Sequence, residues 1–348
     1  MSERLLAVAR ALAFVLLALV LCGAIFEASG FSSVLMFQSI AEGAFESPDA
    51  LMNSLRWALP LFLTAAGVVI SFRCGYFNVG AQGQFYLGAI GTTFVVTWLN
   101  GAPALLVVPL ALAAGIAAGM VWAAWPGLLR IRSGTDEVIT TLMANFIAGL
   151  VLIWVTSGPL KDPSGTGQVS ASRPVALAYR ISDSSGVSHA ILGIVLICAV
   201  LVWLLVNRTA FGVLSSLAGR NPVMITWQGA SLPRLGLAGF LLSGAFAGLA
   251  GAVEILGPNG RLVSGFEPTH GFTAILIALV AGLSVSGVVA VALFFGGLAA
   301  ASLYLPVIAG LPAAAIDVIN ASIALFITAR AIPLPDWLRR FARPAGAP

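Results

Sequence analysis

The chain has 348 residues and a formal net charge of +4, and 59% of its residues are apolar while only 9% are charged. Soluble globular chains carry roughly 25% charged residues, so 17 basic and 13 acidic side chains cannot cover a water-facing surface of this size. A mean hydropathy of +1.03 agrees. The composition excludes an ordinary soluble domain and predicts an all-α polytopic membrane protein, in which residues 1–348 form a single domain.

About ten transmembrane helices are expected from apolar runs, since a bilayer core needs about 20 helical residues. The runs are Leu5–Phe26, Leu51–Phe72, Phe85–Leu99, Ala104–Trp125, Val138–Ser157, Ala190–Asn207, Leu235–Gly257, Phe272–Leu283, Val285–Leu305 and Ala313–Ile332. Only Ser284, Ser286 and Gly287 separate the eighth run from the ninth. The shorter run Phe31–Ile40 is expected to lie at the membrane interface.

The first run follows Arg4 and Arg10, as the core of a cleaved signal peptide would. The residues from Ala11 to Phe26 lack a small-x-small cleavage site. We therefore expect this run to remain as the first span.

The basic residues predict the orientation. With ten spans and the N-terminus in the cytoplasm, twelve arginines lie inside: Arg4, Arg10, Arg73, Arg130, Arg132, Arg208, Arg220, Arg234, Arg330, Arg339, Arg340 and Arg343. Five basic residues lie outside: Arg56, Lys161, Arg173, Arg180 and Arg261. This positive-inside bias predicts cytoplasmic N- and C-termini. It places the polar loop 158–188 outside and the loop 208–234 inside, the latter as one or two short helices against the membrane.

Counting residues excludes most enzymatic chemistry. The single lysine, Lys161, precedes Asp162 and Pro163, so the chain has no P-loop for nucleotide phosphates. His189 and His270 are far apart, lack metal-site spacing and are expected as interfacial residues at helix starts. The three cysteines are scattered, without CxxC spacing. We expect no catalytic residue, no metal site and no cofactor in this chain.

Three stripes of polar or small residues recur at helical spacing. Glu137, Thr141 and Asn145 share one helix face. The second stripe is Ser243, Ala247, Gly251 and Glu254, and the third is Asp317, Asn320, Ala324 and Thr328. Hydrogen bonding between helices explains any one stripe, whereas three in one bundle favour a hydrophilic path. The pairs Gly115–Gly119 and Gly244–Gly248 are interpreted as packing faces.

Glycines and amides interrupt the apolar pattern at residues 73–84. Non-helical backbone at membrane depth needs protein or water partners, and broken helices often mark transporter binding sites. Asn78, Gln82 and Gln84 could bind a polyhydroxylated solute. The alternative is a tight cytoplasmic turn.

The run Gly75-Tyr-Phe-Asn-Val-Gly-Ala-Gln-Gly-Gln84 resembles a signature of ABC importer permeases for nucleosides and simple sugars. Gly134-Thr-Asp-Glu-Val-Ile-Thr-Thr-Leu-Met-Ala-Asn145 is similar to a second motif of that family, and a third joins 212–231 to 248–254 and 271–272. The sequence departs from the family at Gln82, usually Glu, at Asp136, commonly Asn, and at 284–286, usually an Asn-Pro turn.

The resemblance implies a multi-pass permease of a prokaryotic inner (plasma) membrane. Its partners would be an ATP-binding subunit carrying ATP and Mg²⁺, a second permease subunit forming a heterodimer, and an extracytoplasmic solute-binding lipoprotein. Substrate-pathway residues would be Asn78, Gln82, Gln84, Glu137, Thr141, Asn145 and Glu254. Residues coupling to the ATPase would be Ala218, Gly219, Arg220, Asn221, Met224, Trp227 and Gly229.

A two-turn helix is predicted between Asn221 and Gly229, because proline suits a first helical turn and glycine the position past the end. Its apolar residues could dock on the ATPase or pack against the chain's own bundle. Two other functions remain open: a branched-chain amino acid permease and a stand-alone secondary transporter. An intramembrane enzyme or a scaffold lacks support, since no nucleophile–base pair is evident.

Overall fold

The structure is a computed structural model that describes residues 3–164, 169–182, 186–265 and 269–329, with side chains described between 15 and 326. The described residues are helical and include no β-strand, as predicted for an all-α protein. The helices are α1 (Glu3–Ala28), α2 (Ser33–Ala44), α3 (Pro48–Arg73), α4 (Ala81–Trp98), α5 (Ala104–Ser133), α6 (Glu137–Ser157), η1 (Leu177–Tyr179), α7 (His189–Arg208), α8 (Ala210–Ala218), α9 (Pro222–Trp227), α10 (Leu232–Glu254), η2 (Ile255–Asn259), α11 (His270–Val280), α12 (Val285–Ala301), α13 (Leu305–Ile308) and α14 (Ala315–Ala329).

Each expected span coincides with a helix. Five helices among the described residues are long and apolar enough to cross a membrane: α3, α5, α6, α7 and α10 with η2. Helices α11, α12 and the apolar parts of α1 and α14 are shorter. The separation of α11 from α12 falls at the predicted place, because the chain turns at 281–284 before Val285. The helices thus agree with a membrane protein of several spans, while the number ten and the orientation remain predictions.

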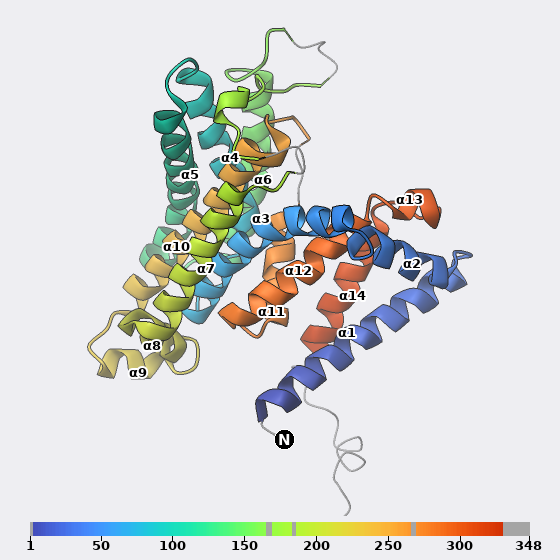
Figure 1. Cartoon of the computed structure of the whole chain (residues 1–348). Helices are drawn as coiled ribbons and strands as arrows, with labels where there is room; N and C mark the ends of the chain where they lie inside the picture. The colour runs from blue at the N-terminus through green and yellow to red at the C-terminus, as the bar shows by residue number, and fades with distance from the viewer. Residues whose placement is uncertain (1–2, 165–168, 183–185, 266–268, 330–348) are drawn as a thin grey trace, which may run out of the picture. The chain divides into compact units, whose positions relative to one another are not determined.

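The chain divides into two compact units, residues 1–39 with 302–348 and residues 40–301. In the larger unit α10 packs against α3, α4 and α5, α4 packs against α5, and α12 packs along α3 (Figure 1). Almost every α3 residue from Ala58 to Phe72 is buried, which makes α3 the central helix of this unit. Helices α6 and α7 expose apolar side chains such as Leu150, Trp154 and Leu196 on their outer faces.

Close approach of α5 to α10 depends on the predicted glycine faces. A Cβ atom added to Gly119 would lie 2.2 Å from the carbonyl oxygen of Gly244. One added to Gly248 would lie 2.2 Å from the carbonyl oxygen of Gly115. Any side chain at these positions would force the helix backbones apart. The two small-residue pairs therefore pack against each other, as expected.

The polar segment after α6 is folded against the neighbouring turns. Residue Lys161 pairs with Ser172, and Ala171 pairs with Val263, as isolated antiparallel bridges. The hydroxyl of Tyr179 donates to the carbonyl oxygen of Ala102 at 2.8 Å. The described part of the loop 158–188 thus covers the turn between α4 and α5, and 165–168 and 183–185 lie outside the described residues.

The smaller unit contains α1, α13, α14 and the beginning of α2, and α1 packs along α14 (Figure 1). The Cys22 thiol lies 3.9 Å from the carbonyl oxygen of Val318. In the third polar stripe Asp317 is exposed and Asn320 is half-buried, whereas the side chain of Thr328 is outside the described residues. The C-terminal residues 330–348, with the four arginines predicted to be cytoplasmic, are outside them too.

Candidate functional site

Residues 74–80 between α3 and α4, the interrupted segment, turn back into the bundle. Helix α3 ends at Arg73, and Gly75 adopts a positive φ of 79°, which only glycine adopts without strain. The Ser71 hydroxyl donates to the carbonyl oxygen of Tyr76 at 2.8 Å. From there the chain rises to Asn78, which hydrogen-bonds Ser243 in the middle of α10. Residues 74–80 are therefore a re-entrant connection rather than a turn at the end of the bundle.

Asn78 organises the start of α4. Its Nδ2 atom donates to Gln84 Oε1 at 2.9 Å and to Ser243 Oγ at 3.0 Å. Its Oδ1 atom accepts from Gln84 Nε2 at 3.0 Å and from the backbone nitrogen of Gly80 at 2.9 Å. Asn78 and Ser243 are fully buried, and Gln84 is nearly so. This closed network satisfies a buried amide pair where a helix begins.

The α6 stripe binds the backbone of the same segment. Asn145 Oδ1 accepts from the backbone nitrogen of Gly83 at 2.8 Å, and its Nδ2 donates to the carbonyl oxygen of Val79 at 2.9 Å. Thr141 Oγ1 accepts from the Val79 nitrogen at 3.2 Å. Glu137 lies 3.4 Å from the backbone nitrogen of Phe77. Glu137, Thr141 and Asn145 lie four residues apart on one helix face, so their side chains follow the non-helical backbone one after another. They replace the helical hydrogen bonds that this backbone lacks.

Gln82 joins the start of α4 to the start of α11. Its Oε1 atom accepts from the backbone nitrogen of Gly271 at 2.7 Å. The backbones meet so closely that a Cβ atom on Gly271 would lie 2.2 Å from the Gln82 nitrogen. The side-chain amide thus supplies the acceptor oxygen that the Gly271 N–H requires.

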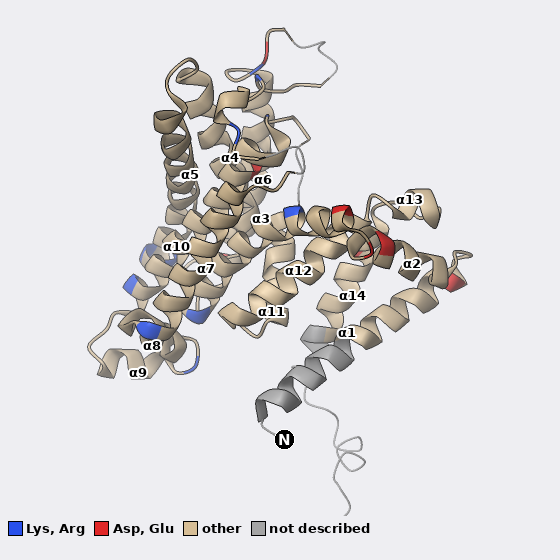
Figure 2. Cartoon of the chain, viewed as in Figure 1, with Lys and Arg blue, Asp and Glu red and all other residues tan. Residues whose placement is uncertain are grey.

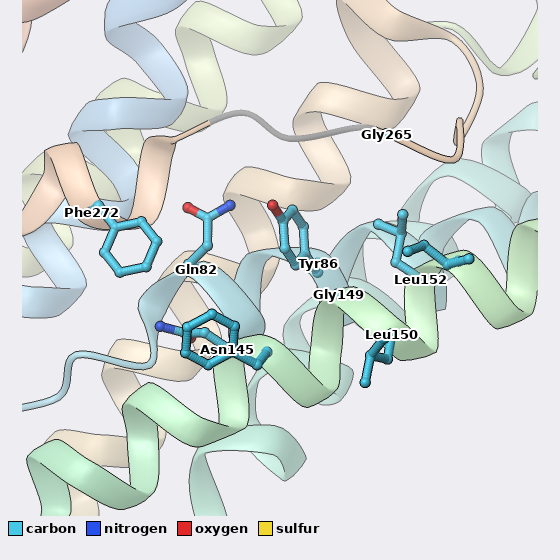
Figure 3. Close-up of a pocket in the computed structure, with 10 residues that line it drawn as sticks. Gln82, Tyr86, Asn145, Gly149, Leu150, Leu152, Gly265 and Phe272 are labelled. Carbon is cyan, nitrogen blue, oxygen red and sulfur yellow. The ribbon is translucent and has the colours of Figure 1, made fainter. Parts of the chain in front are cut away.

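A pocket of about 330 Å³ opens beside this network, between α4, α6, α11 and Gly265 (Figure 3). It is lined by Gln82, Tyr86, Asn145, Phe146, Gly149, Leu150, Leu152, Ile153, Gly265 and Phe272. Gln82 and Tyr86 rise from α4 on the same side, and the ring of Phe272 lies next to Gln82 (Figure 3). The pocket thus combines two amides with three aromatic rings and aliphatic walls, a composition typical of small-molecule sites.

Glu254 lies in a separate group at the end of α10. Its Oε1 atom is 3.5 Å from Arg56 Nη2 and accepts from Asn259 Nδ2 at 3.0 Å. The carboxylate is buried and its two partners are half-buried, and their hydrogen bonding and charge compensate the cost of removing its charge from water. Nearby, His270 is buried between the rings of Trp57 and Phe85, at centroid distances of 5.5 and 5.3 Å. His270 begins α11 as expected, but it is a core residue rather than an interfacial one.

Helices α8 and α9 lie where α3 ends. Asn221 caps α9 by accepting from the backbone nitrogen of Met224, and Pro222 occupies the first turn, as predicted. Ile225 is buried in a cluster with Cys74, Ala218 and Leu235. On the other face Val223, Met224 and Trp227 are exposed by 64%, 47% and 86%. The helix therefore packs on its own bundle through one side and leaves the other side free in this chain.

The end of α8 contacts the interrupted segment directly. A Cβ atom on Gly219 would lie 3.0 Å from the carbonyl oxygen of Arg73. One on Gly75 would lie 3.4 Å from the carbonyl oxygen of Ala218. Arginines at the ends of α3, α5 and α7 gather at the same end of the unit (Figure 2). The end of α8 is thus in backbone contact with the residues that lead to Asn78.

The sequence profile of the family described as branched-chain amino acid transport system / permease component matches residues 50–328. The chain belongs to this permease family. The guanosine ABC transporter permease protein of Bacillus subtilis is 34% identical over 303 residues, 86% of each chain. The glucose ABC transporter permease protein TsgB13 of Haloferax volcanii is 33% identical over 293 residues, 81% of this chain and 76% of the relative. The nucleoside ABC transporter permease protein NupB of Lactococcus lactis is 27% identical over 317 residues, 88% and 86% of the two chains.

The chain is therefore the permease subunit of an ABC importer and not itself an enzyme. Of the pathway residues predicted for the permease, Gln82 and Asn145 line the pocket. The others do not: Asn78 and Gln84 lie behind it, Glu137 and Thr141 bind the segment 77–79, and Glu254 is elsewhere. The rings of Tyr86, Phe146 and Phe272 were not predicted. Two features of the sequence pointed to them. Tyr86 lies one helical turn after Gln82, and Phe146 and Phe272 directly follow the motif residues Asn145 and Gly271.

Proposed function

We propose that the permease translocates nucleosides through the pocket between α4, α6 and α11, with related simple sugars as a second solute class. The observation that carries this proposal is the combination of three aromatic rings with the amides of Gln82 and Asn145. Planar bases stack on aromatic rings, while amides supply donors and acceptors for their polar edges. A sugar alone offers no planar ring. The relatives named for guanosine and nucleosides support the same choice.

We assign ATP hydrolysis and its Mg²⁺ to a separate ATP-binding subunit, because the only lysine, Lys161, is not in a P-loop. A second permease subunit completes a heterodimer, and an extracytoplasmic lipoprotein delivers the solute. The assembly belongs in the inner (plasma) membrane of a prokaryote. Membership of the permease family supports these partners.

The orientation we propose has the end with α8 and α9 in the cytoplasm, together with both termini. Arg73, Arg130, Arg132 and Arg208 end their helices on this side, in agreement with the positive-inside rule. Residues 158–188 then face outward, toward the solute-binding protein. Helix α9, with its exposed Met224 and Trp227, faces the ATP-binding subunit.

Coupling in this proposal follows a short chain of contacts. Movement of α8 and α9 on the ATPase shifts the end of α3 through Gly219 and the start of the interrupted segment through Gly75. The segment is bound to Asn145, and Asn145 lines the pocket. ATP-driven closure of the partner would therefore change the pocket and alternate its access.

An uptake assay with the complete importer tests the solute. The wild-type complex is expected to accumulate labelled guanosine in an ATP-dependent way. Phe272→Ala removes one ring from the pocket, and a base–aromatic stack is worth about 1–3 kcal/mol. Uptake at low solute concentration should therefore fall roughly fivefold to a hundredfold.

Phe94→Ala serves as the matched control, because Phe94 lies on α4, is 44% exposed and does not line the pocket. Its uptake should equal that of the wild type. ATP-dependent uptake of labelled glucose or leucine, without uptake of guanosine, would instead favour a sugar or a branched-chain amino acid permease. Uptake without any ATPase would favour the stand-alone transporter.

A further inference from the structure

A second pocket of about 330 Å³ lies at the end of the larger unit that carries α8 and α9. It is formed where α3 and α8 end and where α11 turns toward α12. Two arginines line it, Arg73 from the end of α3 and Arg220 from the turn after α8. Phe77 and Leu283 provide apolar walls, and none of the described residues that line the pocket is acidic.

The two arginines lack a negative partner in the described part of the chain. The Nε atom of Arg73 is buried without a hydrogen bond, and its Nη1 atom makes only a long 3.4 Å contact with the carbonyl oxygen of Leu283. Neither arginine belongs to an ion pair among the described residues. The neighbouring acid, Glu137, is paired with Arg130 at 3.2 Å. The two like charges, and the buried N–H group that has no partner among the described residues, each carry a free-energy cost.

A carboxylate would remove these costs. Guanidinium groups bind carboxylates through paired, charge-assisted hydrogen bonds. The apolar walls would cover the methylene stem that carries the carboxylate, as in an acidic side chain. The pocket therefore has the charge and the lining of a receptor for Glu or Asp.

The neighbourhood of the pocket indicates where that side chain comes from. The pocket adjoins Ser216 and Gly219 at the end of α8, and α9 follows at once with Met224 and Trp227 exposed. Exposed aromatic and aliphatic anchors beside a charged site are typical of a protein interface, in which a few such residues supply most of the binding energy. A lipid phosphate would also satisfy the charge, and the composition of the surrounding vesicle distinguishes these two sources.

We propose that Arg73 and Arg220 form a socket for a Glu or Asp side chain of the ATP-binding subunit, an inference that rests on the proposed function. Arg73 directly precedes the interrupted segment that leads to Asn78. The acidic side chain therefore holds the end of α3 itself. Movements of the ATPase reach the segment through this ion pair as well as through α9.

A zero-length cross-link tests the socket. The chain has one natural lysine, in the loop 158–188, so Arg220→Lys places a new amine in the pocket and keeps the charge. With the intact importer in detergent, a carbodiimide should join this amine to a partner carboxylate and produce a permease–ATPase band. Mass spectrometry identifies the acidic residue. Arg132→Lys is the matched control, since Arg132 is exposed at the same end and does not line the pocket.

Charge reversal supplies the functional readout. Arg220 is exposed, so Arg220→Glu should insert normally, yet it should lower recovery of the ATPase with the permease about tenfold or more, since like charges then meet. Arg132→Glu should leave recovery unchanged. An absent cross-link together with normal recovery for Arg220→Glu would overturn the socket, while recovery of the ATPase with the wild type would still uphold the importer.

A lipid phosphate as the occupant of the pocket predicts a different result, which depends on the lipid composition. The wild type and Arg220→Glu are compared in vesicles of phosphatidylcholine, with and without phosphatidylglycerol. A defect present only with phosphatidylglycerol would assign the pocket to a lipid phosphate and overturn the proposal. A defect of equal size in both kinds of vesicle supports the protein partner. If the wild type recovers no ATPase at all, the proposed function itself fails.

Discussion

At the residue scale, the polar side chains of the permease complete the hydrogen bonding of a backbone that is not helical. Asn78, inside the interrupted segment, hydrogen-bonds the backbone at the start of α4. Asn145, on α6, hydrogen-bonds the backbone of Val79 and Gly83. Buried backbone groups are almost always paired, so residues 74–83 can lie deep in the bundle only with such partners. These polar side chains thus have a structural role, and Asn145 also lines the pocket of the proposed pathway.

Asn145→Ala leaves the Gly83 nitrogen and the Val79 carbonyl without their partners. Each unpaired buried group costs about 1–3 kcal/mol, so we expect the purified protein to unfold at a lower temperature and uptake to fall. Asn207→Ala, at an exposed helix end, should change neither. Thermal unfolding and uptake are measured on the same preparations. Lost uptake with unchanged stability would indicate direct contact with solute, whereas normal values for both would refute the assigned role.

At the element scale, α9 has two faces with different tasks. Ile225 is fully buried against Cys74 and Leu235, which anchors the helix to the bundle. Met224 and Trp227 extend away from that cluster. Helix α9 therefore fits both interpretations of its sequence pattern. One side packs against the chain's own bundle, and the other side is available to a partner.

Replacing Met224 and Trp227 together by Ser removes the exposed anchors but leaves Ile225 in place. We expect normal membrane insertion together with loss of the ATPase, or with ATP hydrolysis uncoupled from transport, because aromatic and aliphatic anchors dominate interface energies. Co-purification and the ratio of ATP hydrolysed to solute transported measure this. Val213→Ser, on an exposed position of α8, is the control. A double variant that binds the ATPase and transports at the wild-type rate would exclude α9 as the coupling element.

At the scale of the whole molecule, charge is distributed unevenly over the larger unit. Arginines gather at the end with α8 and α9, where the ends of α3, α5 and α7 meet (Figure 2). The described residues 160–164 and 169–182 are folded on the turn between α4 and α5. By the positive-inside rule this asymmetry predicts that the end with the arginines faces the cytoplasm.

Cysteine labelling checks the orientation. A cysteine at Ser164 should react with an impermeant maleimide from outside intact cells, and one at Ser216 only after the cytoplasmic side is opened. Membranes that contain the permease alone are used, so that no partner covers Ser216. The natural cysteines Cys22, Cys74 and Cys198 are buried and provide a low background. Labelling of Ser164→Cys only from the cytoplasmic side would invert the topology and the proposed coupling with it.

The sequence by itself determined the class of the protein, the position of its helices and its family. Lipid acts on each segment locally, so an apolar run such as Val138–Ser157 predicts a helix wherever that helix packs. Local rules likewise predicted α9 from Pro222 and Gly229. The motifs around Asn78 and Asn145 pointed to the permease family.

Only the tertiary structure decided which of these residues meet. Asn78 bonds Ser243 instead of facing the pocket, and Glu254 pairs with Arg56. The juxtaposition of Arg73 with Arg220 is equally absent from any local pattern. Such pairings depend on how closely and at what angle the helices cross. That geometry arises from the packing of all helices together, including the backbone approach at Gly119 and Gly248, so no single segment of the sequence contains it.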